Sequence, residues 1–208
     1  MADVVNPKQG LATADNDRFL RQWYEIDINK IKFDTKSISD SKESGVKWFP
    51  YNKGGAFRRW YGNYDYVVNW ENDGQEIRNF VDDKGKLRSR PQNTDYYFRE
   101  AITWSKISSG AISFRYKESG NIFADAGMSV FMNHNQILYF MGLMNSKVVS
   151  SILSILSPTL NYEVGHISAI PVLIKEIDNE IIKDNINIGK LDWDTYEDSW
   201  NFTNHPLI

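Results

Sequence analysis

The stretch QILYFMGLMNSKVVSSILSIL, residues 136–156, decides the fold class, because its apolar residues recur at helical spacing. Steps of three and four positions place these residues on one face of a helix, and such a face is typical of a packed core. Ser157-Pro158 follows directly, and proline cannot continue a helix. The sequence therefore predicts one long core helix over about residues 136–156. Its buried face is expected to hold Ile137, Phe140, Met141, Leu143, Met144, Val148, Ile152 and Ile155.

Short aromatic and β-branched segments bounded by Gly, Asn and polar clusters precede this helix, and this pattern predicts strands. The expected strands are 26–33, 47–51, 57–61, 64–70, 101–107, 111–117 and 121–124, with an edge strand at 170–172. Gly62-Asn63 is a two-residue turn signal, which predicts a hairpin of 57–61 with 64–70. The other expected segments are short helices at 15–25, 75–81 and 192–200, a polar loop at 37–45, and an exposed, mobile loop at 83–93. We expect an α+β fold, a mixed or antiparallel β-rich domain with the 136–156 helix packed on the sheet.

Length and composition exclude several classes of protein. The chain has 208 residues and no cysteine, so disulfides, thiolate catalysis and cysteine zinc sites are excluded. No apolar run approaches the length of about 18 residues that a membrane span needs, and no signal peptide is apparent. We therefore expect a cytoplasmic protein of one large domain without a membrane partner.

Basic and aromatic residues are concentrated in the middle of the chain. Residues 47–117 carry 13 basic and 8 acidic groups, a net charge of +5, and 16 of the 29 aromatic residues. Residues 118–208 carry 4 basic and 11 acidic groups, a net charge of −7. Cations among aromatic rings suit a polyanion with flat bases. The alternative is a sheet with aromatic cross-strand pairs and a solvated basic face.

A search for catalytic and metal motifs finds none. The G-x-S-x-G, phosphate-loop and H-E-x-x-H patterns are absent. His134, His166 and His205 lie far apart in the sequence, which favours structural or exposed roles over metal binding. Gly54-Gly55 favours a backbone turn or a close approach rather than a phosphate cradle. We therefore predict no catalytic residue and no metal site in this chain.

Four motifs carry a resemblance to a known family. GLATADNDRFLRQWYEI (10–26) resembles the segment that leads, in many adenine-N6 DNA methyltransferases, from the catalytic domain into the target-recognition domain. That likeness rests on Gly10, Thr13, Asn16 and Phe19, and Ala14 stands where a glycine is usual. The others are KWFPYNKGGAFRRWYGNYDYVVNWENDGQEI (47–77), KLRSRPQNTDYYFREAITWSKISSGAISFRY (86–116) and LMNSKVVSSILSILSPTLNYEVGHISAIPV (143–172). Together they are similar to the PglX methyltransferases of BREX phage-defence systems.

The resemblance implies a piece of a larger enzyme. That family uses S-adenosylmethionine and an [N/D]-P-P-[Y/F] tetrapeptide, whereas no two prolines of this chain are adjacent. We expect the fragment to need no cofactor and to methylate nothing alone, while the parent protein is an S-adenosylmethionine-dependent adenine methyltransferase. The expected organisation is a linker at 1–25 from the missing methyltransferase domain, a target-recognition domain at 26–175 and an acidic C-terminal extension at 176–208.

The expected partners are double-stranded DNA, the missing methyltransferase domain and, as further candidates, other BREX subunits. Forked side chains suit base edges, and those predicted here are Arg58, Arg59, Arg88, Arg90, Gln92 and Asn93. Point charges suit phosphates, and the candidates are Lys47, Lys53, Lys84, Lys86, Arg99, Lys106, Arg115 and Lys117. On a strand Arg58 and Arg59 would face opposite sides, so at most one would meet DNA. The alternative function is a protein-interaction domain that docks the methyltransferase onto other defence subunits through its acidic half.

Overall fold

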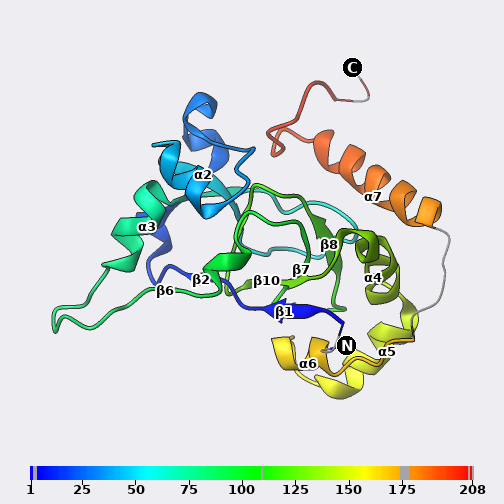
Figure 1. Ribbon diagram of the computed structural model, residues 1–208. Helices are drawn as coiled ribbons and strands as arrows, with labels where there is room; N and C mark the ends of the chain where they lie inside the picture. The colour runs from blue at the N-terminus through cyan, green and yellow to red at the C-terminus, as the bar shows by residue number, and fades with distance from the viewer. Residues whose placement is uncertain (2–3, 109, 174–178, 206, 208) are drawn as a thin grey trace.

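Two four-stranded sheets form the centre of the molecule, and helices cover their outer sides (Figure 1). The computed structural model describes residues 1, 4–108, 110–173, 179–205 and 207. Within this part of the chain most strand pairs are antiparallel, and β4–β9 is a parallel pair. The predicted α+β class is confirmed.

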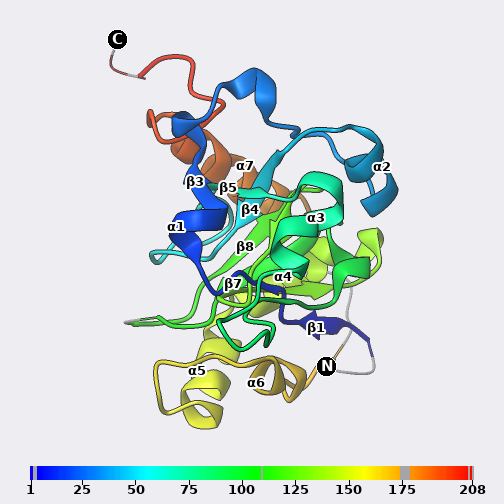
Figure 2. The same cartoon turned by 90° about the vertical axis from the view of Figure 1, so that its left-hand side faces the viewer.

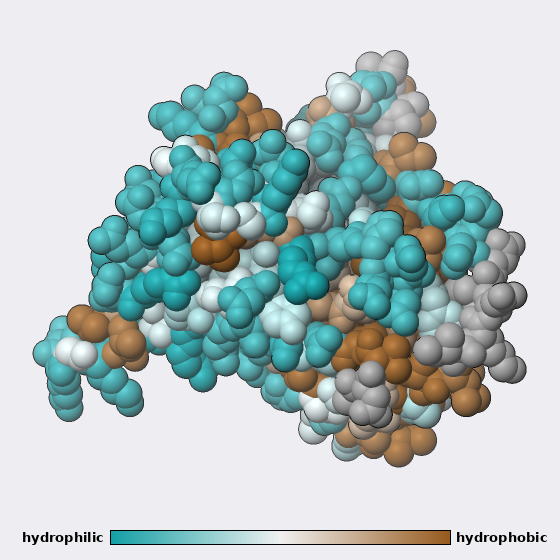
Figure 3. Space-filling view, in the orientation of Figure 1, coloured by the Kyte–Doolittle hydropathy of each residue, from teal (hydrophilic) through white to brown (hydrophobic). Residues whose placement is uncertain are grey.

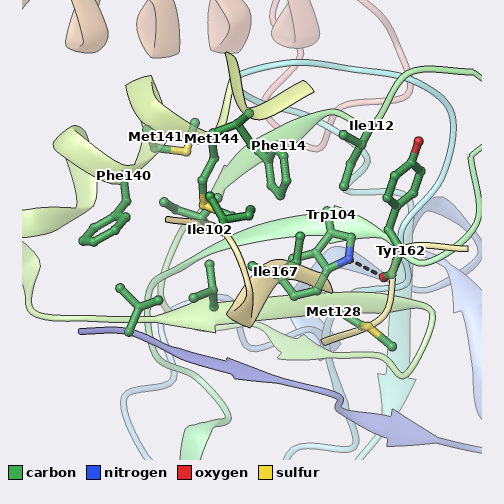
Figure 4. Close-up of a cluster of buried hydrophobic side chains, with 14 of the residues drawn as sticks. Ile102, Trp104, Ile112, Phe114, Met128, Phe140, Met141, Met144, Tyr162 and Ile167 are labelled. Atoms are coloured by element: carbon green, nitrogen blue, oxygen red, sulfur yellow. Dashed lines mark hydrogen bonds between the residues drawn. The ribbon is translucent and has the colours of Figure 1, made fainter. Parts of the chain in front are cut away.

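The first sheet has the strand order β1, β10, β7, β8, and all its pairs are antiparallel. Its strands are β1 (Asn6–Lys8), β10 (Gly127–Phe131), β7 (Ala101–Ser105) and β8 (Phe114–Lys117). Helices α4 (Ile137–Met144), α5 (Lys147–Leu156) and α6 (Val164–Ser168) bury one face of it. Figure 4 shows this core, where the Trp104 indole donates a hydrogen bond of 2.8 Å to the Tyr162 carbonyl.

The second sheet has the order β3, β5, β4, β9 and a separate aromatic core. Its strands are β3 (Leu20–Gln22), β5 (Tyr66–Asn69), β4 (Trp48–Asn52) and β9 (Ile122–Phe123). Around it lie α1 (Asn16–Phe19), α2 (Ile38–Glu43), α3 (Glu71–Arg78) and the 3-10 helices η1 (Trp23–Glu25) and η2 (Ile28–Lys30). A two-stranded sheet of β2 (Leu11–Ala12) and β6 (Arg90–Pro91) lies beside it, followed by η3 (Thr94–Tyr96).

Buried polar side chains join the two sheets. Thr103 of β7 donates to Asn52 of β4 at 3.0 Å, and both residues are fully buried. Arg115 and Lys117 of β8 are also fully buried, on the opposite side of that strand from Phe114. Both faces of β8 are therefore covered by protein.

The predicted helix over 136–156 is two helices, and the prediction of one continuous helix is wrong. The axis bends by 73° between His134–Met144, which includes the 3-10 helix η4 (His134–Gln136), and Lys147–Leu156. The Asn145 amide bonds to both the N–H (3.2 Å) and the carbonyl (3.1 Å) of Phe114, and the Ser146 hydroxyl caps α5 at the Val149 N–H. The break thus satisfies backbone groups that a straight helix would leave unpaired. Over the described residues no single helix is long and apolar enough to cross a membrane, and this bent pair passes that test only by length and composition.

Several shorter predictions are also wrong. The helix expected over 15–25 stops at Phe19, because Leu20–Gln22 pairs with β5 instead. The 57–70 hairpin does not form, since Trp60 bridges to Arg115 and the positive φ angles of Trp60 and Asn63 turn the chain away. The 26–33 segment holds η2 rather than a strand, 37–45 holds α2 rather than a loop, and 170–172 is not a strand.

Helix α7 (Asn179–Asp194) was not predicted, and the helix expected at 192–200 is limited to its final residues. Figure 1 shows it in orange beside α4. Ile182 and Ile186 pack on the first core, and Trp193 packs with Tyr61 and Tyr64. Packing at both ends of α7 holds it against the body of the molecule.

Candidate nucleic-acid interface

Residues 80–90 leave the body of the molecule as a hairpin arm (Figure 1, left), which points toward the viewer in Figure 2. The arm closes its hydrogen bonds within itself. Arg88 N–H donates to the Phe80 carbonyl and Asp82 N–H to the Lys86 carbonyl, both at 2.9 Å. The Asp82 carboxylate accepts from the N–H groups of Lys84 and Lys86 at 2.9 Å each, which fixes the turn.

The returning strand of the arm carries its cations on one side. Lys86, Arg88 and Arg90 are exposed and alternate with Leu87 and Ser89. Ser89 is buried, and its hydroxyl donates to the Ile77 carbonyl. Since side chains alternate along an extended strand, the inward Ser89 directs its two neighbours outward. Figure 3 shows the outer end of the arm as a hydrophilic surface.

The base of the arm is fastened by the two amides that the sequence marked as base-contacting. Gln92 Nε2 donates to the Gly10 carbonyl at 3.4 Å, and Asn93 Nδ2 donates to the Gln9 carbonyl at 2.8 Å. Arg90 lies opposite Ala12 in the β2–β6 pair. Both amide nitrogens are thus occupied by backbone, while the amide oxygens and the Arg90 guanidinium point to no printed partner within the described chain.

The turn at Asp125-Ala126 brings three segments to the base of the arm. Asp125 N–H donates to the Leu11 carbonyl at 3.1 Å, and Lys106 N–H donates to the Ala126 carbonyl at 2.8 Å. Gly54 has φ +86°, and a Cβ there would lie 2.9 Å from the Ala126 oxygen. The expected close approach at Gly54 is confirmed, and the backbones of 10–12, 53–55 and 105–106 converge on this turn.

The two cations that enter this region behind the turn already have partners. Lys106 Nζ lies 2.9 Å from a Glu163 carboxylate oxygen. Lys53 Nζ lies 4.3 Å from the centre of the Tyr66 ring. Lys53 remains available to an anion, because a cation–π contact leaves its hydrogen-bond donors free. For Lys106 a phosphate would have to compete with a carboxylate.

Loop 53–63 separates Arg58 from Arg59. Arg58 turns inward, where its guanidinium pairs with Asp192 at 2.8 Å and stacks over the Trp193 ring at 4.9 Å. Arg59 is exposed and lies 5.6 Å from the centre of the Phe57 ring. The predicted separation of these two cations therefore occurs, with Arg59 on the outer side.

Arg99 extends the basic surface on the other side of η3. Its guanidinium lies 5.1 Å from the Tyr96 ring, and Lys8 of β1 lies 5.3 Å from the same ring. Lys8 was not among the predicted contacts, because it lies in the segment taken as a linker. The signal that could have found it is the neighbouring Gln9-Gly10, which the β6–η3 amides fasten.

Two predicted phosphate contacts are wrong. Arg115 and Lys117 are fully buried, so neither can reach a phosphate. Burial lowers the pKa of Arg115 to about 10 and that of Lys117 to about 7. Arg115 donates to Ser105 Oγ (3.2 Å) and to the Arg58 carbonyl (3.4 Å), and Lys117 donates to the Arg99 carbonyl. These cations hold the interface segments from within.

The remaining surface offers no assembled catalytic set among the described residues. No three His, Asp or Glu side chains in that part of the chain gather as a metal site would require. An open pocket of about 600 Å³ lies between α7 and η4. Its charged groups are engaged, since His134 pairs with Glu100 and Lys183 with Glu180, each at 2.6 Å. What the surface can do is present cations, rings and amides to a polyanion.

Comparison with known proteins places this fold and surface among DNA-modifying enzymes by descent. No family model matches the chain. Its curated relatives are adenine-specific methyltransferases. PglX of Lacticaseibacillus casei (strain Zhang) is 40% identical over 212 residues, which cover 100% of this chain and 18% of that protein. BrxX of Escherichia coli O9:H4 (strain HS) is 38% identical over 195 residues, which cover 92% of this chain and 15% of that protein.

The chain is therefore homologous to one segment of the PglX and BrxX adenine-specific methyltransferases, and the resemblance carried by the sequence motifs is confirmed. It spans less than a fifth of the length of either relative.

Proposed function

We propose that this chain is the DNA-recognition part of an adenine-specific N6 DNA methyltransferase of a BREX-type phage-defence system. In this proposal residues 26–175 hold the duplex, 1–25 link them to the catalytic domain and 176–208 are an acidic extension. Methyl transfer from S-adenosylmethionine takes place in another part of the same cytoplasmic protein, and this part is not catalytic alone. The homology to named adenine-specific methyltransferases supports the class of enzyme.

The arm is the observation that carries the recognition role. Lys86, Arg88 and Arg90 lie on one side of a projecting strand, and no described carboxylate forms an ion pair with them. An exposed row of unpaired cations repels itself and gains most from a polyanion, whose condensed counterions are released on binding. A two-stranded β-ribbon also fits the major groove, where a guanidinium can form two hydrogen bonds with guanine.

The recognition role also meets a need of the chemistry. An enzyme that modifies a base within a duplex must move that base out of the stack. Contacts to neighbouring phosphates fix the register, and contacts to base edges select the site. The arm, Arg59 and the Arg99–Lys8 pair provide such contacts around the Asp125-Ala126 turn.

A salt series tests the proposal. Affinity for a labelled duplex is measured by fluorescence anisotropy for the wild type, for Arg88→Glu with Arg90→Glu, and for a control with the same change of net charge, Lys42→Glu with Lys147→Glu. Both control lysines are exposed and lie on α2 and α5. We expect wild-type affinity to fall with salt, and the arm variant to lose about 0.9 of logarithmic slope per lost phosphate contact. Salt-independent wild-type binding, or equal loss in both variants, contradicts the proposal.

Docking onto another protein is the second candidate function. Apolar side chains are exposed on α5 and α7, among them Ile155 (80%), Val148 (67%), Leu191 (69%) and Ile188 (64%). Figure 3 shows hydrophobic surface at the lower right, where Figure 1 places α5. Exposed apolar patches of this kind mark interaction sites. Unchanged DNA affinity and unchanged methylation sequence after reversal of Arg88 and Arg90 would favour docking over recognition.

A further inference from the structure

We infer that Phe57 is a base-stacking residue, whose ring packs on an unstacked base of DNA held at the interface. This inference rests on the proposed recognition function and adds a contact that is neither a phosphate contact nor a hydrogen bond to a base edge. It concerns the outer side of loop 53–63, opposite the inward Arg58–Asp192 pair.

Phe57 is exposed where the other phenylalanines are covered. Its side chain is 55% exposed, while each of the other ten, all within the described residues, is buried or half-buried. It packs in none of the three hydrophobic clusters. The ring therefore adds little to the stability of the fold and is free to meet a ligand.

The loop that carries Phe57 is held in place from below. Ser105 Oγ accepts from the Gly55 N–H at 3.0 Å and donates to the Gly55 carbonyl at 2.9 Å. Asn63 Nδ2 donates to the Ala56 carbonyl at 3.0 Å. The backbone on the N-terminal side of Phe57 is thus bonded at two successive residues, which reduces the ordering cost of binding through its ring.

The residue after Phe57 is held by an internal cation. Arg115 is fully buried, forms no ion pair with a described carboxylate, and donates to the Arg58 carbonyl at 3.4 Å. A buried guanidinium with no carboxylate partner costs stability. Its bonds go to Arg58, Ser105 and Ser113, so two of its three partners define the base of this loop.

The position beside Phe57 suits a nucleotide. The exposed Arg59 guanidinium lies 5.6 Å from the ring centre, so a phosphate at Arg59 would bring its base near the ring. Gly54 at the start of the loop packs on the Ala126 carbonyl, at the turn that also contacts the base of the arm. Aromatic rings beside cations bind unstacked bases regardless of sequence.

The test compares two duplexes that differ by one base. One is fully paired, and the other carries a single extrahelical 2-aminopurine in the same sequence. Binding by the full 208-residue chain is followed by anisotropy, and stacking by 2-aminopurine fluorescence. The variants are Phe57→Ala, the conservative Phe57→Tyr, and Tyr196→Ala as a control for an aromatic side chain of similar exposure (50%).

We expect the wild type to prefer the extrahelical duplex by about tenfold and to quench its fluorescence. Phe57→Ala should lose both effects with an unchanged salt slope, and Phe57→Tyr and Tyr196→Ala should keep them. Salt-dependent wild-type binding with an unaffected Phe57→Ala overturns this inference alone. Absent or salt-independent binding of both duplexes by the wild type overturns the proposed function and the inference with it.

Discussion

Replacing Lys117 by methionine should change how the stability of this chain depends on pH. Lys117 is fully buried near the end of β8, with its ammonium bonded to the Arg99 carbonyl and 6.0 Å from the Phe131 ring. Burial lowers its pKa to about 7, whereas a lysine in an unfolded chain has a pKa of about 10.4. Between these two values the unfolded chain binds more protons than the folded chain, so stability rises as the pH rises.

The size of the effect follows from those two pKa values. Each pH unit in that window contributes at most about 1.4 kcal/mol to the free energy of unfolding. From pH 7, where about half of the folded molecules carry the charge, to pH 9, the gain is about 2 kcal/mol. Below pH 7 the penalty for burying the charge is fully present, and it shrinks as the folded lysine loses its proton.

The assay is urea unfolding of the wild type and Lys117→Met at pH 7, 8 and 9. Taking the difference between the two proteins removes the titration of groups that they share. We expect the variant to be more stable at pH 7 and its advantage to shrink by about 2 kcal/mol at pH 9. A difference that stays constant across this range would refute the reasoning, because it would mean that the carbonyl groups keep the ammonium charged.

Three further substitutions probe the fold. Gly10→Ala should cost about 3 kcal/mol in urea unfolding, because its Cβ would lie 1.9 Å from the Phe123 oxygen, and wild-type stability would contradict that close approach. Ser146→Ala should cost about 1 kcal/mol by removing the cap of α5, measured in the same way, and a neutral result would show that the Asn145 bonds alone set the break. Trp193→Ala should cost about 3 kcal/mol and expose α7 to limited proteolysis, since Trp193 joins that helix to Tyr61 and Tyr64, while unaltered protection would count against this anchor.

The sequence predicted the strands whose pattern is local and missed the elements set by distant partners. Segments 47–51 and 101–107 contain β4 and β7, as their aromatic and β-branched residues indicate. Leu20–Gln22 looks helical in sequence and becomes a strand only because β5 pairs with it. The break at Asn145 depends on Phe114, which lies 31 positions earlier in the chain.

The same limit applies to the candidate site. Cations of the 84–93 segment could be predicted because they lie in a polar, turn-rich stretch that had to be exposed. Arg115 and Lys117 alternate with aromatic residues just as solvent-facing cations of a one-sided sheet do. The second sheet and loop 53–63 cover that face of β8, and nothing near these residues in the sequence indicates it.

The self-contained bonding of the arm has an evolutionary consequence. Beyond Ser89 its hydrogen bonds close between residues 80 and 88, and a side chain at Gly85 would meet no atom within 4 Å. Insertions, deletions or wholesale exchange of this tip would therefore leave both sheets undisturbed. Related chains can diversify there at little cost in foldability, and shuffling arms between homologues offers a direct way to alter what each one selects.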